Sequence, residues 1–147
     1  MPTLTSMSSS ECWQQLGERG VGRIGFDRGR GPRIHPVDYA VHDRRIYVRT
    51  SRDSELADFV AMFGDGALVS FEVDQVTDVT DGRWSVLIAA RIDTPPTDGE
   101  EAALEQPTPT PSGHRGFLVR LSPVEVTGRR LVEVPRGVTS RSTGGSS

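Results

Sequence analysis

The chain contains no lysine, a single cysteine and no long hydrophobic run. Its 17 Lys and Arg residues are all arginine, and 20 Asp and Glu residues bring the net charge to -3. A protein that coats nucleic acid normally carries a clear basic excess, so this balance argues against nucleic acid as a partner. Without an ammonium group, the side-chain cations available to a bound anion are guanidinium groups, with backbone N–H groups beside them.

The shortage of cysteine and of apolar runs excludes further classes. Cys12 alone cannot build an internal disulfide framework or a cysteine-rich zinc site. The longest apolar stretch, Val86 to Ala90, is far shorter than the ~20 residues of a membrane span. The N-terminus lacks the basic start and apolar run of a signal peptide. We therefore expect a cytoplasmic protein that does not associate with a membrane, with one domain in its 147 residues.

Two segments carry helical signals. Ser8 and Glu11 have the spacing of a capping box, which predicts the start of a helix. Gly17 follows the apolar residues of this helix and predicts its end. A second helix is predicted over residues 53–63, where apolar residues recur at i, i+3, i+4 and i+7. Those apolar residues are Leu56, Phe59, Val60 and Phe63.

Alternating apolar and polar residues predict the strands. They lie at residues 21–26, 34–41, 45–50, 67–73, 84–92, 117–121 and 124–134. Between them, the proline-rich segment 93–113 contains one short predicted helix near 100–104. Short strands with so few helices predict a mainly β fold, a six- to seven-stranded antiparallel β-barrel with short accessory helices. The expected organisation is an N-terminal arm at 1–8, the barrel at 9–134 and a disordered Ser/Thr/Gly-rich tail at 135–147.

Few residues have the pattern of a catalytic or metal site. Cys12 has no histidine near it in the sequence, so we interpret it as a half-buried helix residue. His35 and His42 differ in strand parity and point to opposite faces, and His114 joins them only through long-range folding. We therefore expect no metal. The GxSxG and P-loop motifs are absent.

The turn before the second predicted helix is a candidate phosphate site. It combines guanidinium and hydroxyl groups with the free N–H groups of a helix N-terminus. The groups come from Arg49, Thr50, Ser51, Arg52 and Ser54. The alternative is helix capping by Ser51 or Asp53 beside two solvated arginines. Trp84 is a weaker candidate, because it either packs in the core or against a partner subunit, or stacks on a planar ligand.

From Ser9 to Leu131 the chain resembles the pyridoxamine 5′-phosphate oxidase-related family of flavin-binding split barrels. The resemblance rests on the order and spacing of several pieces that follow the opening helix. They are VGRIGF at 21–26, PVDY at 36–39, IYVRT at 46–50, SFEVD at 70–74, GRWSVL at 82–87 and TGRRL at 127–131.

The resemblance implies a split β-barrel that forms a homodimer with two FMN sites at the subunit interface. The isoalloxazine edge would be lined by backbone groups of the PVDY segment, namely Pro36, Val37, Asp38 and Tyr39. Arg49, Thr50 and the turn to Ser54 would hold the ribityl phosphate. Trp84 and Ser85 would approach the same flavin from the partner subunit. The implied activity is a flavin-dependent oxidoreductase that passes hydride through flavin N5 to or from a small-molecule substrate, with no residue identified as a catalytic acid or base.

One position departs from the family pattern. Where the family commonly has Ser-Lys-Leu, with the Lys on the phosphate, this chain has Ser54-Glu55-Leu56. The carboxylate of Glu55 would repel a phosphate dianion unless Arg52 offsets it or Glu55 turns outward. The alternatives are a deazaflavin-dependent reductase, or a non-catalytic split-barrel dimer that binds no flavin and acts as a binding module. If FMN binds, we expect Glu55→Lys to tighten it.

Overall fold

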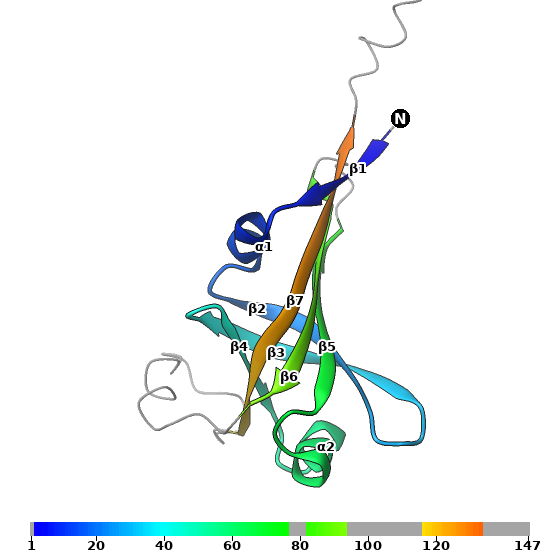
Figure 1. Ribbon diagram of the computed structural model, residues 1–147, viewed down its shortest axis with the longest axis vertical. Helices are drawn as coiled ribbons and strands as arrows, with labels where there is room; N and C mark the ends of the chain where they lie inside the picture. The colour runs from blue at the N-terminus through cyan, green and yellow to red at the C-terminus, as the bar shows by residue number, and fades with distance from the viewer. Residues whose placement is uncertain (1, 77–81, 94–115, 134–147) are drawn as a thin grey trace, which may run out of the picture.

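The computed structural model describes residues 2–76, 82–93 and 116–133 (Figure 1). Its strands form one antiparallel sheet in the order β1-β7-β4-β3-β2-β5-β6, which closes because β6 also pairs with β7. The strands are β1 (Pro2–Met7), β2 (Arg19–Asp27), β3 (Pro32–His42), β4 (Arg45–Thr50), β5 (Leu68–Gln75), β6 (Trp84–Ile92) and β7 (Phe117–Glu133). Six strands make the barrel, and β1 extends it by pairing with β7. The predicted mainly β, antiparallel barrel is confirmed.

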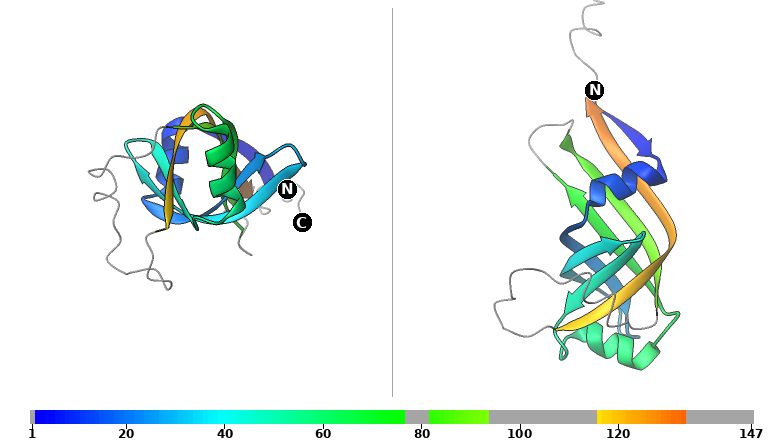
Figure 2. Two further views of the ribbon diagram at one scale, coloured as in Figure 1. Left: turned by 90° about the horizontal axis from the view of Figure 1, so that it is seen from below. Right: turned by 90° about the vertical axis from the view of Figure 1, so that its left-hand side faces the viewer.

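Two short helices accompany the barrel. Helix α1 (Ser9–Leu16) begins after the predicted capping box, in which the Ser8 N–H donates to Glu11 Oε1 at 2.8 Å and the Glu11 N–H donates to Ser8 Oγ at 3.1 Å. Helix α2 (Glu55–Phe63) lies across one end of the barrel, whereas α1 packs near the other end against β6 and β7 (Figure 2). The helix predicted from residue 53 thus begins two residues later.

The last strand differs from the prediction. Residues 117–121 and 124–134 were expected as separate strands, but β7 runs without a break from Phe117 to Glu133. A bulge opposite Ala89 and Ala90 absorbs one extra residue of β7, because Ala89 pairs with Glu125 and Ala90 pairs with Pro123. A proline is tolerated at a bulge, where the ladder is already interrupted, so Pro123 does not end the strand.

The N-terminal arm also has more structure than its sequence signals indicate. Residues Pro2–Met7 form β1 and pair with the end of β7, with Leu4 opposite Leu131. The predicted helix near 100–104, most of the segment 93–113, His114 and the tail from residue 135 lie outside the described residues. Among the helices that the structure describes, none has the length and apolar character needed to cross a bilayer.

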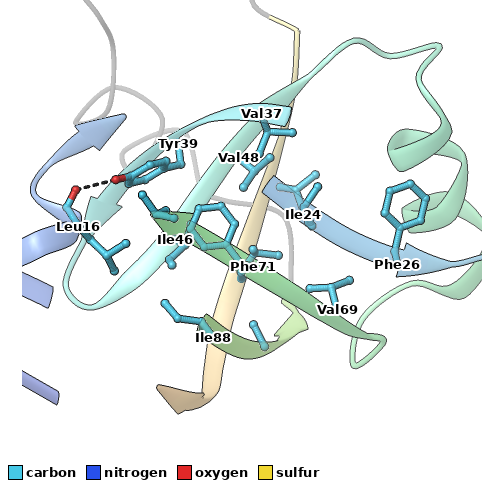
Figure 3. Close-up of a cluster of buried hydrophobic side chains, with 14 of the residues drawn as sticks. Leu16, Ile24, Phe26, Val37, Tyr39, Ile46, Val48, Val69, Phe71 and Ile88 are labelled. Carbon is cyan, nitrogen blue, oxygen red and sulfur yellow. Dashed lines mark hydrogen bonds between the residues drawn. The ribbon is translucent and has the colours of Figure 1, made fainter. Parts of the chain in front are cut away.

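The barrel interior is filled by aromatic and branched side chains (Figure 3). The Tyr39 hydroxyl is buried and donates to the Leu16 carbonyl at 2.7 Å, which ties β3 to the end of α1. The Tyr39 ring meets the Phe71 ring edge-to-face at 5.3 Å. A Cβ at Gly22 would lie 2.7 Å from Phe71 Cζ, so the glycine of β2 makes room for the ring. This packing fixes which residues of β3 face inward and which face the barrel surface.

Candidate functional site

The candidate site lies where β3 continues past the end of β4. The β3–β4 pairing ends at Asp38 and Arg49, whereas the β2–β3 pairing continues to Pro32. At Pro36 and Val37, therefore, β2 is the only ladder partner of β3 among the residues that the structure describes. The chain leaves β4 at Thr50 beside this stretch of β3, and the predicted isoalloxazine and phosphate segments thus meet at one end of the barrel.

The turn from β4 into α2 is organised by Ser54. The Ser54 side chain is the helix cap: its Oγ accepts from the Ala57 N–H at 3.0 Å and from the Thr50 hydroxyl at 2.8 Å. The capping alternative named Ser51 or Asp53, and the structure assigns the cap to Ser54 instead. Ser51 donates to the Asp53 carboxylate through a short hydrogen bond, which lowers the pKa of Asp53. Asp53 therefore carries a negative charge within the turn.

The two arginines of the turn are placed by strand pairing and by an aromatic contact. Val48 is in the core, so Arg49, the next residue of β4, faces the outer surface of the barrel next to Asp38. The Arg52 guanidinium lies over the Phe117 ring at 5.9 Å, and Phe117 pairs with Thr50. This contact holds a cation beside the turn without involving a carboxylate.

Glu55, the residue that departs from the family pattern, contacts one histidine and two arginines. Its Oε1 lies 3.0 Å from His35 Nε2. Its Oε2 lies 3.5 Å from Arg33 Nε and 3.9 Å from Arg28 Nη2. All three partners belong to the β2–β3 hairpin, and Arg28 also contacts Asp58 of α2 at 3.4 Å. The Glu55 carboxylate is thus engaged with the hairpin.

The contacts of Glu55 with the hairpin could not be predicted from the sequence. In the sequence, residues 27–31 are polar and rich in glycine, which predicts only a turn, and His35 does not have the pattern of a metal site. The available signal was the combination of an arginine-rich hairpin and an acidic first turn of the following helix. Only the register of β2 and β3, together with the position of α2 across the barrel end, brings the two charged groups together.

The PVDY segment alternates between the inside and the outside of the barrel. The side chains of Val37 and Tyr39 are buried in the core, where the hydroxyl of Tyr39 is bonded to Leu16. Pro36 and Asp38 are exposed on the outer face. A ligand at this face therefore meets the side chains of Pro36 and Asp38, and reaches Val37 and Tyr39 only through their backbone.

Trp84 and Ser85 lie far from the other predicted site residues of the same chain. Trp84 pairs with Arg130 of β7, whereas Arg49 pairs with Leu118 of the same strand. At about 3.3 Å per residue, roughly 40 Å of strand separates these two positions along β7. The Trp84 indole N–H donates to Gln75 at 2.9 Å. One chain therefore does not bring these residues to the turn at Arg49.

Cys12 and the described histidines make no second site. The Cys12 thiol is buried between α1 and the barrel, and this burial raises its pKa above the ordinary value. A buried thiol with a raised pKa is a poor nucleophile. Within residues 2–76, 82–93 and 116–133, no group of three or more His, Cys, Asp or Glu side chains has the arrangement of a metal site.

Comparison with known proteins identifies similar chains. The family model described as pyridoxamine 5′-phosphate oxidase matches residues 8–130. The uncharacterized protein Rv0080 of Mycobacterium tuberculosis is 28% identical over 132 residues, which are 88% of this chain and 86% of that protein. A solved candidate pyridoxamine 5′-phosphate oxidase of Corynebacterium glutamicum is 27% identical with a TM-score of 0.67, covering 89% of this chain and 100% of its own. A solved FAD-binding protein of Mycobacterium smegmatis is 24% identical with a TM-score of 0.65, covering 87% and 98%.

Proposed function

Because the chain belongs to the pyridoxamine 5′-phosphate oxidase family, we propose that it binds a flavin, with FMN as the leading candidate. The proposed site is the end of the barrel where β3 continues past the end of β4. The proposed activity is that of an oxidoreductase that exchanges hydride with a small-molecule substrate. The observation that carries the proposal is the meeting of the PVDY segment and the turn 49–54 at one end of the barrel, within a family match that spans nearly the whole barrel.

The chemistry of the donor set fits a flavin phosphate. Arg49 and Arg52 supply guanidinium groups, Thr50 and Ser51 supply hydroxyls, and the first turn of α2 supplies backbone N–H groups. Asp53 and Glu55 carry the opposite charge. Glu55 is paired with Arg28 and Arg33 of the hairpin, so its presence does not by itself prevent an anion from binding at the turn.

The roles of the residues follow from where they lie. Arg49, Arg52 and Thr50 would bind the phosphate, and the backbone of Pro36 and Val37 would contact the edge of the ring system. The flavin would supply two-electron redox chemistry when bound. The protein would bind, orient and partly shield the ring. No side chain in the described part of the site is assigned as a catalytic acid or base.

A second subunit would complete the site. Trp84 and Ser85 lie far from Arg49 along β7 in one chain, so their proposed contact with the flavin requires a partner. We therefore propose a homodimer in which the start of β6 from one chain covers the flavin held by the other. The Mycobacterium smegmatis relative described as FAD-binding makes the dinucleotide a form of flavin to test beside FMN.

A cofactor titration tests the proposal. The purified protein is examined for flavin absorbance and then titrated with FMN, FAD, riboflavin and a deazaflavin coenzyme, with fluorescence quenching as the measurement. We expect FMN or FAD to bind at micromolar concentration and to bind more tightly than riboflavin, because the phosphate contacts the turn at Arg49. A colourless protein that takes up no flavin at high micromolar concentration contradicts the proposal. Binding of the deazaflavin alone would make the chain a deazaflavin-dependent reductase.

The second candidate function is a non-catalytic split-barrel binding module. Glu55 favours it, because the family lysine is replaced by a residue of opposite charge. The two candidates differ in redox behaviour. An oxidoreductase is expected to convert an added substrate through its bound flavin, whereas the binding module would take up no flavin.

A further inference from the structure

Glu55 is the first residue of α2, directly after the cap Ser54 and the turn proposed to bind phosphate. At this position a carboxylate has two directions available. It can face the turn, where it would meet the phosphate, or it can face the β2–β3 hairpin. The contacts with His35, Arg33 and Arg28 place it on the hairpin side.

The closest of these partners, His35, is itself held in place by aromatic packing. The His35 ring meets the Phe26 ring edge-to-face at 5.2 Å, and Phe26 packs on Phe59 of α2, also at 5.2 Å. Helix α2, which carries Glu55, therefore also supplies the ring that packs on Phe26 and supports the position of His35. Glu55 is partly buried, with 34% of its side chain exposed, so its ion pairs are less screened than those of a fully exposed group.

We propose that the hairpin side chains of Arg33 and His35 are positioning residues for the flavin phosphate, which act by holding the Glu55 carboxylate away from the turn 49–54. The inference rests on the proposed flavin function. The chain has lost the family's lysine, and in this arrangement it avoids the repulsion that a free glutamate would exert on a phosphate. The positive charge at the phosphate then comes from Arg49 and Arg52.

The proposal predicts that the effect of Glu55→Gln on FMN affinity depends on whether Arg33 and His35 are present. A count of net charge alone predicts the same effect in both backgrounds. In the intact chain the carboxylate is already held by the hairpin, so Glu55→Gln changes FMN affinity little. When Arg33 and His35 are removed, only the longer contact to Arg28, at 3.9 Å, remains on the hairpin side, and we expect the carboxylate to turn toward the phosphate. Glu55→Gln then restores much of the lost affinity. Riboflavin has no phosphate, and its affinity serves as the internal reference.

The experiment uses the full chain and four variants: Glu55→Gln, Arg33→Met/His35→Phe, the triple variant that combines them, and Arg30→Met. His35→Phe keeps a ring against Phe26 and removes the ring nitrogens. Arg30→Met is the matched control, because it removes an arginine of the same hairpin that makes no ion pair with Glu55 in the described part of the chain. FMN and riboflavin dissociation constants are measured by fluorescence quenching, and thermal unfolding verifies that each variant is folded.

We expect Arg33→Met/His35→Phe to weaken FMN about fivefold, while riboflavin affinity and the Arg30→Met control change less than about twofold. Glu55→Gln is expected to recover most of that loss in the double variant, yet to change FMN affinity less than about twofold in the intact chain. Equal effects of Glu55→Gln in both backgrounds would overturn the proposal, as would equal losses for FMN and riboflavin. If the unaltered chain binds no flavin, the proposed function itself fails, and the inference with it.

Discussion

Cys12 is the residue whose environment is most sharply defined by packing. Its side chain is fully buried at the junction of α1 and the barrel, facing Gly128 of β7. A Cβ added at Gly128 would lie 2.5 Å from Cys12 Sγ and 3.3 Å from the Ser85 carbonyl. The contact explains why β7 carries a glycine in the middle of a strand, where glycine is otherwise unfavourable. It also explains a buried thiol without invoking chemistry.

This contact gives a prediction about stability. Gly128→Ala is expected to lower the free energy of unfolding by about 1–3 kcal/mol, because a tightly packed core does not accept an extra methyl group without displacement. Cys12→Ala removes the sulfur that the methyl group would meet. The double variant Cys12→Ala/Gly128→Ala should therefore be more stable than the sum of the single changes implies. Denaturant unfolding of the four proteins measures the coupling, and strict additivity would contradict it.

Glu55→Lys is expected to lower the stability of the protein while raising its affinity for FMN. A lysine at position 55 would face Arg28, Arg33 and His35, so we expect the free energy of unfolding to fall by about 1 kcal/mol. The ammonium group, repelled from the hairpin, would turn toward the phosphate and tighten FMN binding.

The control for this substitution is Asp58→Lys, which makes the same charge change one turn further along α2. Asp58 is more exposed and contacts only Arg28 among these three cations. Its substitution should affect FMN binding and stability less than Glu55→Lys. Unfolding curves without ligand and FMN titrations of both variants test the two effects. Unchanged FMN affinity in Glu55→Lys would show that position 55 does not reach the phosphate.

At the scale of single elements, local signals predicted the structure where they were strong. The capping box at Ser8 and the glycine at 17 bracket α1, and the strands 45–50 and 84–92 have the predicted bounds. The prediction was wrong at β7, where two separate strands were expected and one strand runs through Pro123. A proline removes one backbone donor, and whether that ends a strand depends on the partner strand. Here the bulge opposite Ala89 and Ala90 accommodates it.

The capping box of α1 gives a prediction about pH. Hydrogen bonds from the backbone N–H and side chain of Ser8 lower the pKa of Glu11 below its ordinary value of 4.5. The ionised form is favoured in the folded state, so the stabilisation is present above the unfolded pKa and is lost as the pH falls through the folded one. Glu11→Gln keeps an acceptor at this position but does not titrate.

Unfolding curves from pH 7 down to pH 3 test this prediction. The free energy of unfolding should fall less steeply below pH 4.5 in Glu11→Gln than in the unaltered chain. Parallel pH profiles for the two proteins would show that the capping box does not select the ionised form. Ser8→Ala, which removes the side-chain cap itself, should cost about 1 kcal/mol at neutral pH.

At the scale of the whole molecule, barrel closure decides which segments meet. The β3–β4 hairpin itself places Asp38 next to Arg49, and the closing β6–β7 pairing places Trp84 far from Arg49 along β7. Most of the candidate phosphate turn could be recognised from its residue types. Its relation to the hairpin cations could not, because residues 28, 33 and 35 meet Glu55 only after β2 and β3 have paired and α2 has crossed the barrel end.

The proposed dimer gives the prediction at this scale. Leu87 of β6 is 52% exposed on the outer face, close to Trp84 and Ser85, which are proposed to cover the partner's flavin. Leu87→Glu should shift the protein toward monomer and weaken FMN binding, because a charge in a protein interface loses its hydration. Leu68→Glu is the control, since Leu68 is 58% exposed at the opposite end of β5 and β6, near α2. Sedimentation of the unaltered chain as a monomer at micromolar concentration contradicts the dimer.

The sequence by itself determined the class of fold, the first helix and the residue types of the phosphate turn, because strand alternation, capping and helical periodicity are local patterns. Only the tertiary structure decided the direction of the Glu55 side chain, the continuity of β7 and the burial of Tyr39. Each of these depends on a partner distant in sequence: a cation on the hairpin, a bulge opposite β6 and the carbonyl of Leu16. The absence of lysine shows the same division. It leaves arginine as the cation for the proposed phosphate, and packing at the barrel end determines which arginines contact Glu55.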